Sequence, residues 1–114
     1  MHHPNMLQAN RDRFALTQAE VGELLGLSDH TIGNYENGDR APDLQTTLGL
    51  ALIFGKPPSQ LFPGALHVVV ERVAARFKDL SVKIENETGE AASVRQAFAA
   101  SLSARLTSLA DSAV

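Results

Sequence analysis

The strongest constraint on the fold lies in residues 17–38, where two short helices are marked by start and stop signals. Thr17, followed three residues later by Glu20, matches a capping box, in which each side chain bonds a backbone N–H that a helix start leaves free. Gly26 stands where a helix ends with a residue of positive φ, which glycine adopts without strain. The first helix is therefore predicted between Thr17 and Gly26.

The second helix begins almost at once. Ser28 is a preferred N-cap residue, and Asp29 places a negative charge at the positive end of the helix dipole. Gly38 ends this run. Because only Gly26 and Leu27 separate the two helices, they are expected to meet at a steep angle.

Apolar side chains in both helices recur at the spacing of a helical face. Val21, Leu24 and Leu25 are predicted to form one buried stripe, and Ile32 and Tyr35 to face inward from the second helix.

Gly22 interrupts the first helix at a cost of roughly 1 kcal/mol relative to alanine. That cost is understandable if the second helix crosses closely over this position. Two capped helices that meet at a tight corner, with small polar side chains on the second, have the shape that places a helix in the DNA major groove.

Residues 16–62 read LTQAEVGELLGLSDHTIGNYENGDRAPDLQTTLGLALIFGKPPSQLF. This stretch resembles the phage-repressor and Cro-like helix-turn-helix family, also called the xenobiotic-response-element type, over about residues 6–62. The joint spacing of many separate parts makes the resemblance specific. The matching parts are Leu16-Thr17-Gln18, Gly26-Leu27-Ser28, Thr31-Ile32, Tyr35-Glu36-x-Gly38, Arg40-x-Pro42 and Leu61-Phe62.

The resemblance implies an all-α, five-helix, lambda-repressor-like DNA-binding domain whose recognition helix spans about residues 28–37. It implies base contacts from the outward residues of that helix and phosphate contacts from polar residues around it. The candidate DNA-binding residues are Gln18, Ser28, Asp29, His30, Thr31, Asn34, Arg40 and Arg11.

Some of these candidates have competing structural roles. The Asn34 amide can pair with adenine, or it can simply be solvated. The preferred base of His30 is open. Asp29 can accept from cytosine, but it also suits the helix dipole and is repelled by phosphates, so the structural role is favoured. Arg40 is expected to contact phosphate rather than to remain a solvated loop charge.

Three further positions are read through the family pattern. Gln18 is expected at a phosphate or an outer base, at a helix N-terminus that already favours anions. Arg11 and Glu36 are expected to form an ion pair that ties the first helix to the recognition helix, with part of the guanidinium left for phosphate. Gly33 departs from the family, where serine is more usual, and this puts a phosphate contact there in doubt.

Composition limits the classes of protein to consider. The chain has 114 residues and no cysteine, which fits a reducing compartment and excludes disulfides and thiolate metal sites. No apolar segment reaches the ~20 residues of a membrane span, and no signal-peptide core is present. We expect no membrane association, no cofactor, no metal site (the terminal Met1-His2-His3 included), and a cytoplasmic, nucleoid-associated prokaryotic protein.

Charge weighs against DNA binding by a single domain. Residues 1–62 contain four basic and seven acidic side chains, a net charge of −3, and residues 63–114 are neutral. The usual basic footprint of a nucleic-acid binder is missing. Few neutralised phosphates imply weak non-specific binding, so useful affinity is expected to require two domains acting together.

The remainder of the first domain, residues 1–62, is predicted as one more long helix and a final turn. Asp43 caps that helix, and Gly55 with Pro57-Pro58 ends it. Residues 59–62 form the turn, and Pro63-Gly64 is expected to break the chain. The inner stripe of the long helix is predicted to consist of Leu44, Leu48, Ala51 and Leu52.

Residues 63–114 are predicted to form a C-terminal helical hairpin with its turn at Thr88-Gly89. A strand at Val68-Val69-Val70 is the alternative, but the sustained helical period argues against it. The hairpin alone has nowhere to bury both of its apolar stripes, so dimerisation in a four-helix arrangement is favoured over packing on the first domain. The stripe residues are Leu66, Val69, Val70, Val73, Phe77, Leu80, Ile84, Val94, Phe98, Leu102 and Leu106, with Leu109 at the end.

Two functions from different classes are compatible with this reading. The favoured one is a sequence-specific regulator of transcription, a dimeric repressor that reads an inverted repeat in double-stranded DNA. The alternative is an antitoxin-type module that binds a protein toxin through residues 64–114 and regulates its own operon. An enzyme is not expected, because no nucleophile–base pair, phosphate-binding glycine loop or metal-ligand spacing is present. His30 and His67 lack obvious catalytic partners.

Overall fold

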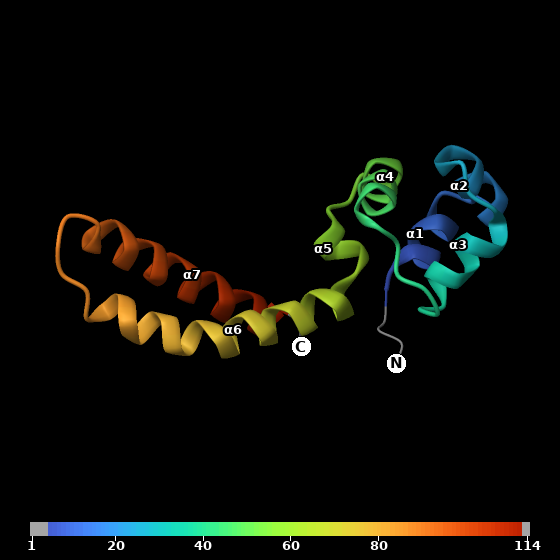
Figure 1. Cartoon of the computed structure of the whole chain (residues 1–114). Helices are drawn as coiled ribbons and strands as arrows, with labels where there is room; N and C mark the ends of the chain where they lie inside the picture. The colour runs from blue at the N-terminus through green and yellow to red at the C-terminus, as the bar shows by residue number, and fades with distance from the viewer. Residues whose placement is uncertain (1–4, 113–114) are drawn as a thin grey trace. The chain divides into compact units, whose positions relative to one another are not determined.

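The computed structural model describes residues 5–112, and within them the chain is entirely helical (Figure 1). The fold-class prediction is therefore confirmed. Met1, His2 and His3 lie outside the described residues. No helix within the described range is long and apolar enough to cross a membrane. The helices are α1 (Leu7–Arg13), α2 (Gln18–Leu25), α3 (Asp29–Glu36), α4 (Leu44–Phe54), α5 (Pro58–Leu61), α6 (Pro63–Glu85) and α7 (Ala92–Ser112).

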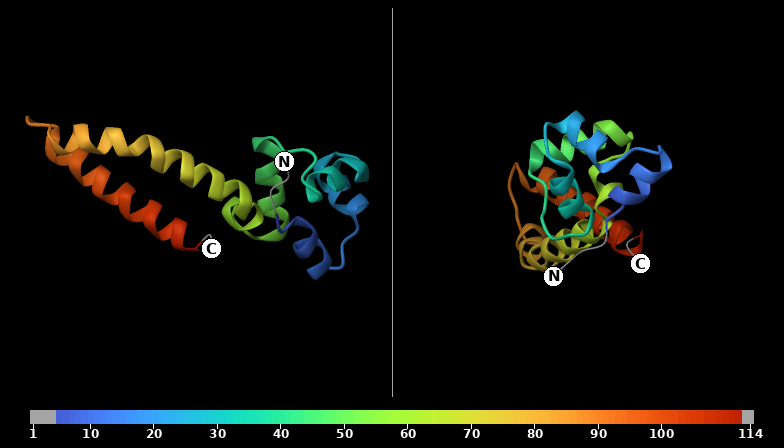
Figure 2. Two further views of the ribbon diagram at one scale, coloured as in Figure 1. Left: turned by 90° about the horizontal axis from the view of Figure 1, so that it is seen from below. Right: turned by 90° about the vertical axis from the view of Figure 1, so that its right-hand side faces the viewer.

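The chain divides into two compact units, one ending at Ala65 and the other beginning at Leu66. The first unit contains α1 to α5, and Figure 2 shows these helices from two further directions. Every one of the five helices contributes to a single apolar core. The buried residues of this core are Leu7, Val21, Ile32, Tyr35, Leu50, Phe54 and Leu61.

The caps that define α2 form as predicted. The Thr17 hydroxyl accepts from the backbone N–H of Glu20 at 3.0 Å, and the Glu20 carboxylate accepts from the N–H of Thr17 at 2.9 Å. Gly26 ends α2 at a φ of 70°. The capping box and the left-handed glycine are both confirmed.

Gly22 is the residue of α2 on which the corner between α2 and α3 packs. A Cβ at this position would lie 2.5 Å from the carbonyl oxygen of Leu27, closer than real Cβ atoms come. The N–H of Leu27 also donates to the carbonyl of Gly22 at 2.8 Å. The close approach predicted at Gly22 is confirmed, but the segment that approaches is the corner at Leu27 and Ser28 and not the second helix itself.

Leu24 was expected in the buried stripe of α2, and this prediction is wrong. Leu24 is exposed, whereas Val21 and Gly22 are buried and Leu25 packs against the core. Because the corner packs on Gly22, the inner face of α2 runs through Val21, Gly22 and Leu25. Leu24 lies beyond the edge of that face.

The inner stripe predicted for α4 is wrong at its three leucines, whereas Ala51 does pack against the core. Leu44, Leu48 and Leu52 are exposed, and the buried residues are instead Leu50 and Phe54, with Ala51 partly buried beside them. The physical reason is that α4 is apolar on all sides, so the period of its leucines could not identify the core-facing side. The prediction therefore took the outer face of α4 for its inner face.

The break predicted at Pro63-Gly64 does not occur. Pro63 is the first residue of α6 and Gly64 continues the helix. Proline suits a first helical position because its missing N–H would have no partner there. The turn predicted at residues 59–62 is the short helix α5, in which Leu61 is fully buried.

The second unit is the predicted helical hairpin. In both Figure 1 and the left view of Figure 2, α6 and α7 run side by side in opposite directions. The turn between them contains Gly89 at a φ of 110°. Across it, the Nε of Arg95 donates to the carboxylate of Glu87 at 2.6 Å, and Gln96 Nε2 donates to the carbonyl of Ile84 at 3.2 Å.

Much of the hairpin's apolar surface remains uncovered. Among the described residues of α6 and α7, Val70 and Ile84 are the buried large apolar side chains. Leu66, Phe77, Leu102 and Leu106 are half-buried. The exposed ones are Val69, Val73, Leu80, Val82, Val94 and Phe98.

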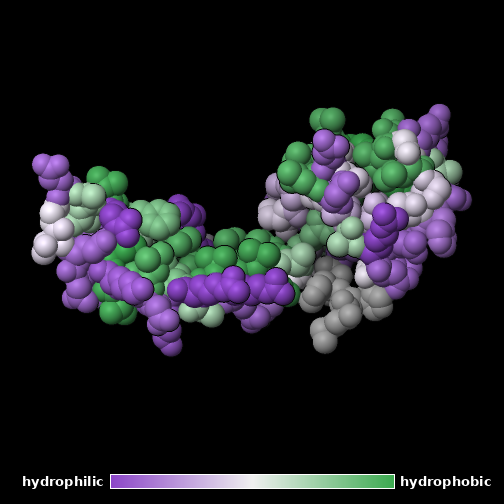
Figure 3. All heavy atoms as spheres, in the orientation of Figure 1, coloured by the Kyte–Doolittle hydropathy of each residue, from purple (hydrophilic) through white to green (hydrophobic). Residues whose placement is uncertain are grey.

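Helix geometry places most of these exposed side chains on one side of the hairpin. At about 100° per residue, Val69, Val73 and Leu80 share a strip of α6 next to the strip that faces α7. Val94 and Phe98 occupy the corresponding strip of α7. Because the helices are antiparallel, the two strips fall on the same side, and Figure 3 shows apolar side chains running along both helices. Val82 points away from this side.

Candidate nucleic-acid interface

α3 has one buried face and one polar face open to solvent. Ile32 and Tyr35 are buried in the core. On the other side Asp29 and His30 are exposed, and Asn34 is half-buried. A short helix whose outer face has only small polar side chains can enter the major groove without steric obstruction.

The first turn of α3 is held by its own side chains. The Ser28 hydroxyl accepts from the N–H of Thr31 at 3.1 Å, and the two hydroxyl groups lie 2.9 Å apart. One hydroxyl donates to the other, so a single hydroxyl hydrogen is left for an outside acceptor such as a phosphate.

The Asp29 carboxylate also serves the helix start. Its Oδ1 accepts from the N–H of His30 at 2.8 Å. This is the structural role favoured from the sequence. Among the outward side chains of α3, those of His30 and Asn34 make no hydrogen bond within residues 5–112.

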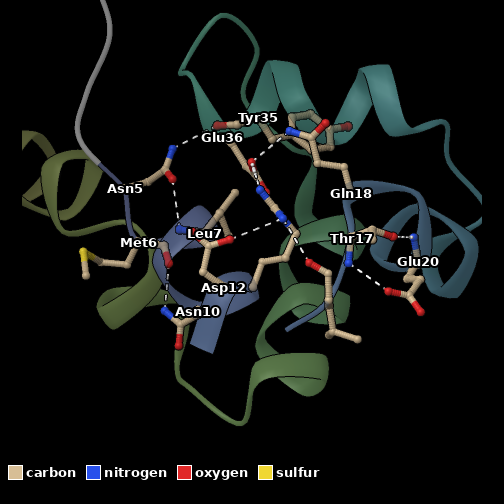
Figure 4. A network of polar contacts seen from close by, with 12 residues as sticks. Asn5, Met6, Leu7, Asn10, Asp12, Thr17, Gln18, Glu20, Tyr35 and Glu36 are labelled. Atoms are coloured by element: carbon tan, nitrogen blue, oxygen red, sulfur yellow. Dashed lines mark hydrogen bonds and ion pairs between the residues drawn. The ribbon is translucent and has the colours of Figure 1, made fainter. Parts of the chain in front are cut away.

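Arg11, Glu36 and Gln18 link the first three helices in one polar network (Figure 4). The Nε of Arg11 donates to Glu36 Oε2 at 2.6 Å, and its Nη2 donates to Oε1 at 3.0 Å. Gln18 Nε2 donates to Glu36 Oε1 at 3.0 Å. A bidentate arginine–carboxylate pair with a third donor fixes the carboxylate strongly, so α1, α2 and α3 are held in one arrangement.

The network defines what Arg11 can do. Its side chain is 13% exposed and that of Glu36 is 5% exposed. Arg11 Nη1 also donates to the carbonyl of Leu16 at 3.0 Å. The bond to Glu36 raises the pKa of Arg11 above its ordinary value, so the guanidinium stays charged. With most donors engaged inside the protein, Arg11 is chiefly a framework residue.

One amide hydrogen of Gln18 remains available to an acceptor outside the protein. Its Nε2 has two hydrogens, and one bond to Glu36 uses only one of them. The side chain extends along α3, where a Cβ at Gly33 would lie 3.4 Å from the Gln18 amide nitrogen. A Cβ at 33 would only be in ordinary van der Waals contact with the amide, so Gly33 lies beside the Gln18 side chain without being crowded by it. The sequence showed Gly33 only as a departure from the family pattern, since nothing in the pattern tied it to Gln18.

Arg40 lies just beyond the C-terminal end of α3. Its N–H donates to the carbonyl of Asn34 at 3.2 Å, which ties the loop to the helix. The guanidinium carbon is 5.9 Å from the centre of the Tyr35 ring. Both residues line a shallow cleft of about 170 Å³. The side chain is exposed, so its charge remains available to an anion.

The candidate residues therefore fall into three groups in the first unit. Ser28, Asp29, His30 and Thr31 lie at the start of α3, Gln18 crosses its middle, and Asn34 and Arg40 lie together near its C-terminal end. Arg11 is set back in the network. Within residues 5–112, no group of three or more His, Cys, Asp or Glu side chains is placed to hold a metal ion.

Comparison with known families agrees with this geometry. Residues 7–61 match the family model described as helix-turn-helix. This part of the chain is a helix-turn-helix domain. Such domains are DNA-binding modules of transcription regulators, and the match runs from the first residue of α1 to the last of α5. No curated protein and no solved structure matched the chain.

Proposed function

We propose that the protein is a dimeric repressor of the phage-repressor and Cro-like type, which reads an inverted-repeat operator with α3 in the major groove. The observation that carries the proposal is the polar outer face of α3, held in place by the network of Arg11, Glu36 and Gln18. A recognition helix requires both an open face and a fixed position.

In this proposal the base-reading residues are Asn34 and His30. Asn34 pairs with adenine through its amide, and His30 reads an outer base as donor or acceptor. Asp29 chiefly stabilises the helix start through its bond to the N–H of His30.

The phosphate contacts surround α3. The spare hydrogen of Gln18 Nε2, the free hydrogen of the Ser28–Thr31 hydroxyl pair and the Arg40 guanidinium all donate to phosphate oxygens. Such contacts set the register of the protein on the duplex and have no sequence preference of their own.

The C-terminal hairpin supplies the dimer interface. The exposed strip formed by Val69, Val73, Leu80, Val94 and Phe98 lies on one side of two antiparallel helices. Two such hairpins meeting along this strip form a four-helix bundle and withdraw the strip from water. A two-fold dimer then predicts half-sites about 10 bp apart, centre to centre.

Dimerisation also compensates for the small number of basic side chains in the DNA-binding domain. The domain has few basic side chains, so a single copy binds weakly. Linking two copies makes the second binding event intramolecular and raises the overall affinity without a new contact.

The antitoxin-type alternative rests on the same exposed strip, because an apolar helical face also fits a protein partner. The two functions differ in what occupies the strip. A chain that is dimeric when purified alone supports the repressor, and a chain that is monomeric alone and forms a stable complex with a toxin encoded beside it supports the alternative.

Selection of bound sites from a random pool of double-stranded DNA tests the proposal. The full-length protein should enrich one inverted repeat with half-sites about one helical turn apart. Enrichment of no sequence would overturn the proposed function. Enrichment of a single, unrepeated half-site would overturn the dimeric reading while leaving the recognition helix in place.

A further inference from the structure

The outer face of α4 has a row of leucines that no part of the first unit covers. Leu44, Leu48 and Leu52 are 73%, 53% and 84% exposed. They recur every four residues and lie opposite the buried Leu50. Leu24 on α2 is also 65% exposed. Figure 3 shows apolar side chains on the surface of the first unit.

The row is set in a helix without any charged residue. From Leu44 to Phe54 the sequence is LQTTLGLALIF. A helix that is apolar on all sides is normally buried on all sides. The inner face of α4 meets this condition within the first unit, and the outer face does not.

The chemistry of the row favours a second copy of the same face as its partner. When a face meets itself across a two-fold axis, each side chain lies near its own copy. Charged residues would then repel one another, whereas the leucines and Gln45 of α4 carry no such cost, and the Asp43 carboxylate at the end of the row is engaged as the cap of the helix. The outer face of α4 can thus pack against a copy of itself.

The size of the row decides when that contact can form. Three or four leucines offer far less than the about 800 Å² per partner that a stable interface buries. A free partner protein would not be held by so small a surface. Two copies already held together, by the hairpin or on one operator, need no independent affinity for the contact to form.

We propose that the outer face of α4 forms a second contact between subunits, in which Leu44, Leu48 and Leu52 pack against the same residues of the partner copy. The inference rests on the proposed dimeric function. Through this contact the two helix-turn-helix domains are locked at one spacing, so only operators with that spacing are bound by both domains at once.

Cysteine cross-linking tests the contact directly, because the chain contains no cysteine. The variants Leu44→Cys, Leu48→Cys and Leu52→Cys are each oxidised mildly as the full chain. A disulfide requires Cα atoms within about 7 Å, so the position nearest the two-fold axis should give covalent dimer at least about tenfold faster than the matched variant Gln60→Cys, on the exposed surface of α5. Equal rates at all four positions would overturn the inference.

Sedimentation of the same samples separates this inference from the dimer proposed for the hairpin. If the protein is dimeric and no α4 position cross-links selectively, the α4 contact is wrong and the hairpin dimer stands. If the protein is monomeric, the hairpin dimer is wrong, and oxidation is repeated on the inverted-repeat DNA recovered by selection. Selective cross-linking on that DNA then supports the α4 contact, and its absence overturns it.

Polar substitution gives an independent readout. Leu48→Gln with Leu52→Gln should leave helicity and binding to a single half-site unchanged, because both side chains are exposed. Binding to the full operator should weaken by about tenfold, equivalent to about 1.4 kcal/mol. Unchanged discrimination between operators of different half-site spacing would contradict the inference.

Discussion

Asn34 is the side chain of α3 on which sequence preference should depend most. Asn34→Ala removes a bidentate partner for adenine and is expected to cost about 1–3 kcal/mol on the selected operator. Preference at one base pair per half-site should relax, because no other side chain replaces the amide. Fluorescence anisotropy on the operator and its single-base variants measures both effects. Gln8→Ala, at an exposed position of α1, is the control. Unaltered base preference would remove Asn34 from the readout.

Gly22 and Gly33 form a matched pair of helical glycines with opposite expected responses. In Gly22→Ala the new methyl meets the Leu27 carbonyl oxygen at 2.5 Å, a backbone atom that cannot move alone. We expect a loss of about 1–3 kcal/mol in the free energy of unfolding. In Gly33→Ala the nearest atom is the movable Gln18 amide at 3.4 Å, so stability should be kept or gained. Chemical denaturation compares the two, and similar losses would contradict the packing described at Gly22.

Asp43 makes the stability of α4 depend on pH. Its carboxylate accepts from the N–H of Thr46 at 2.8 Å, and this bond lowers the pKa of Asp43 below its ordinary value of 3.8. A lowered folded-state pKa stabilises the protein above about pH 4, and the contribution is lost as the pH falls through the folded-state value. Asparagine caps equally well and does not titrate. Melting temperatures of wild type and Asp43→Asn should therefore diverge only below about pH 4, and a constant difference at all pH values would contradict the assignment.

The helices differ in how fully their sequences predict them. α2 and α3 were predictable in position and, apart from Leu24, in orientation, because caps, a left-handed glycine and a crowded Gly22 all specify the same corner. α4 was predictable as a helix but not in orientation, since its apolar residues surround the axis and only the tertiary fold decides which of them face the core. Helix propensity and the spacing of apolar residues contain no information on which face of α4 is buried.

The hairpin helices make a prediction about assembly. Leu80→Gln with Phe98→Gln places two polar amides on the exposed strip and should shift the protein from dimer to monomer. The matched control is Val82→Gln, which is similarly exposed but points away from the strip. Analytical ultracentrifugation over a range of concentrations measures the shift. A control that dissociates as readily as the double variant would show that the strip is not the interface.

In the complete chain, we expect the first unit to fold by itself and the second unit to be required for tight binding to the operator. A chain ending at Ala65 retains the whole core cluster of α1 to α5 and should fold as a monomer. Its operator affinity should fall by a factor of about 10² to 10⁴, the range that linked binding contributes. Circular dichroism checks the fold and anisotropy the affinity. A truncated chain that binds the operator as tightly as the full chain would contradict a role for the hairpin.

The candidate site was only partly predictable from the sequence. The positions of Asn34, His30 and Arg40 follow from the register of α3 and of the loop after it. The bond from Gln18 to Glu36 does not, because it joins residues on different helices that only the tertiary fold brings together. Contacts of this kind appear only when the crossing of α2 and α3 is known.

The buried carboxylate of Glu36 has a consequence for altering this protein. The groups that hold α3 in place lie on its inner side, and the groups proposed to read bases lie on its outer side. Residues 30 and 34 can thus be exchanged without disturbing the scaffold beneath them. The domain is accordingly suited to reprogramming: new target sequences can be sought by randomising a few outward positions, while thermal stability is set elsewhere.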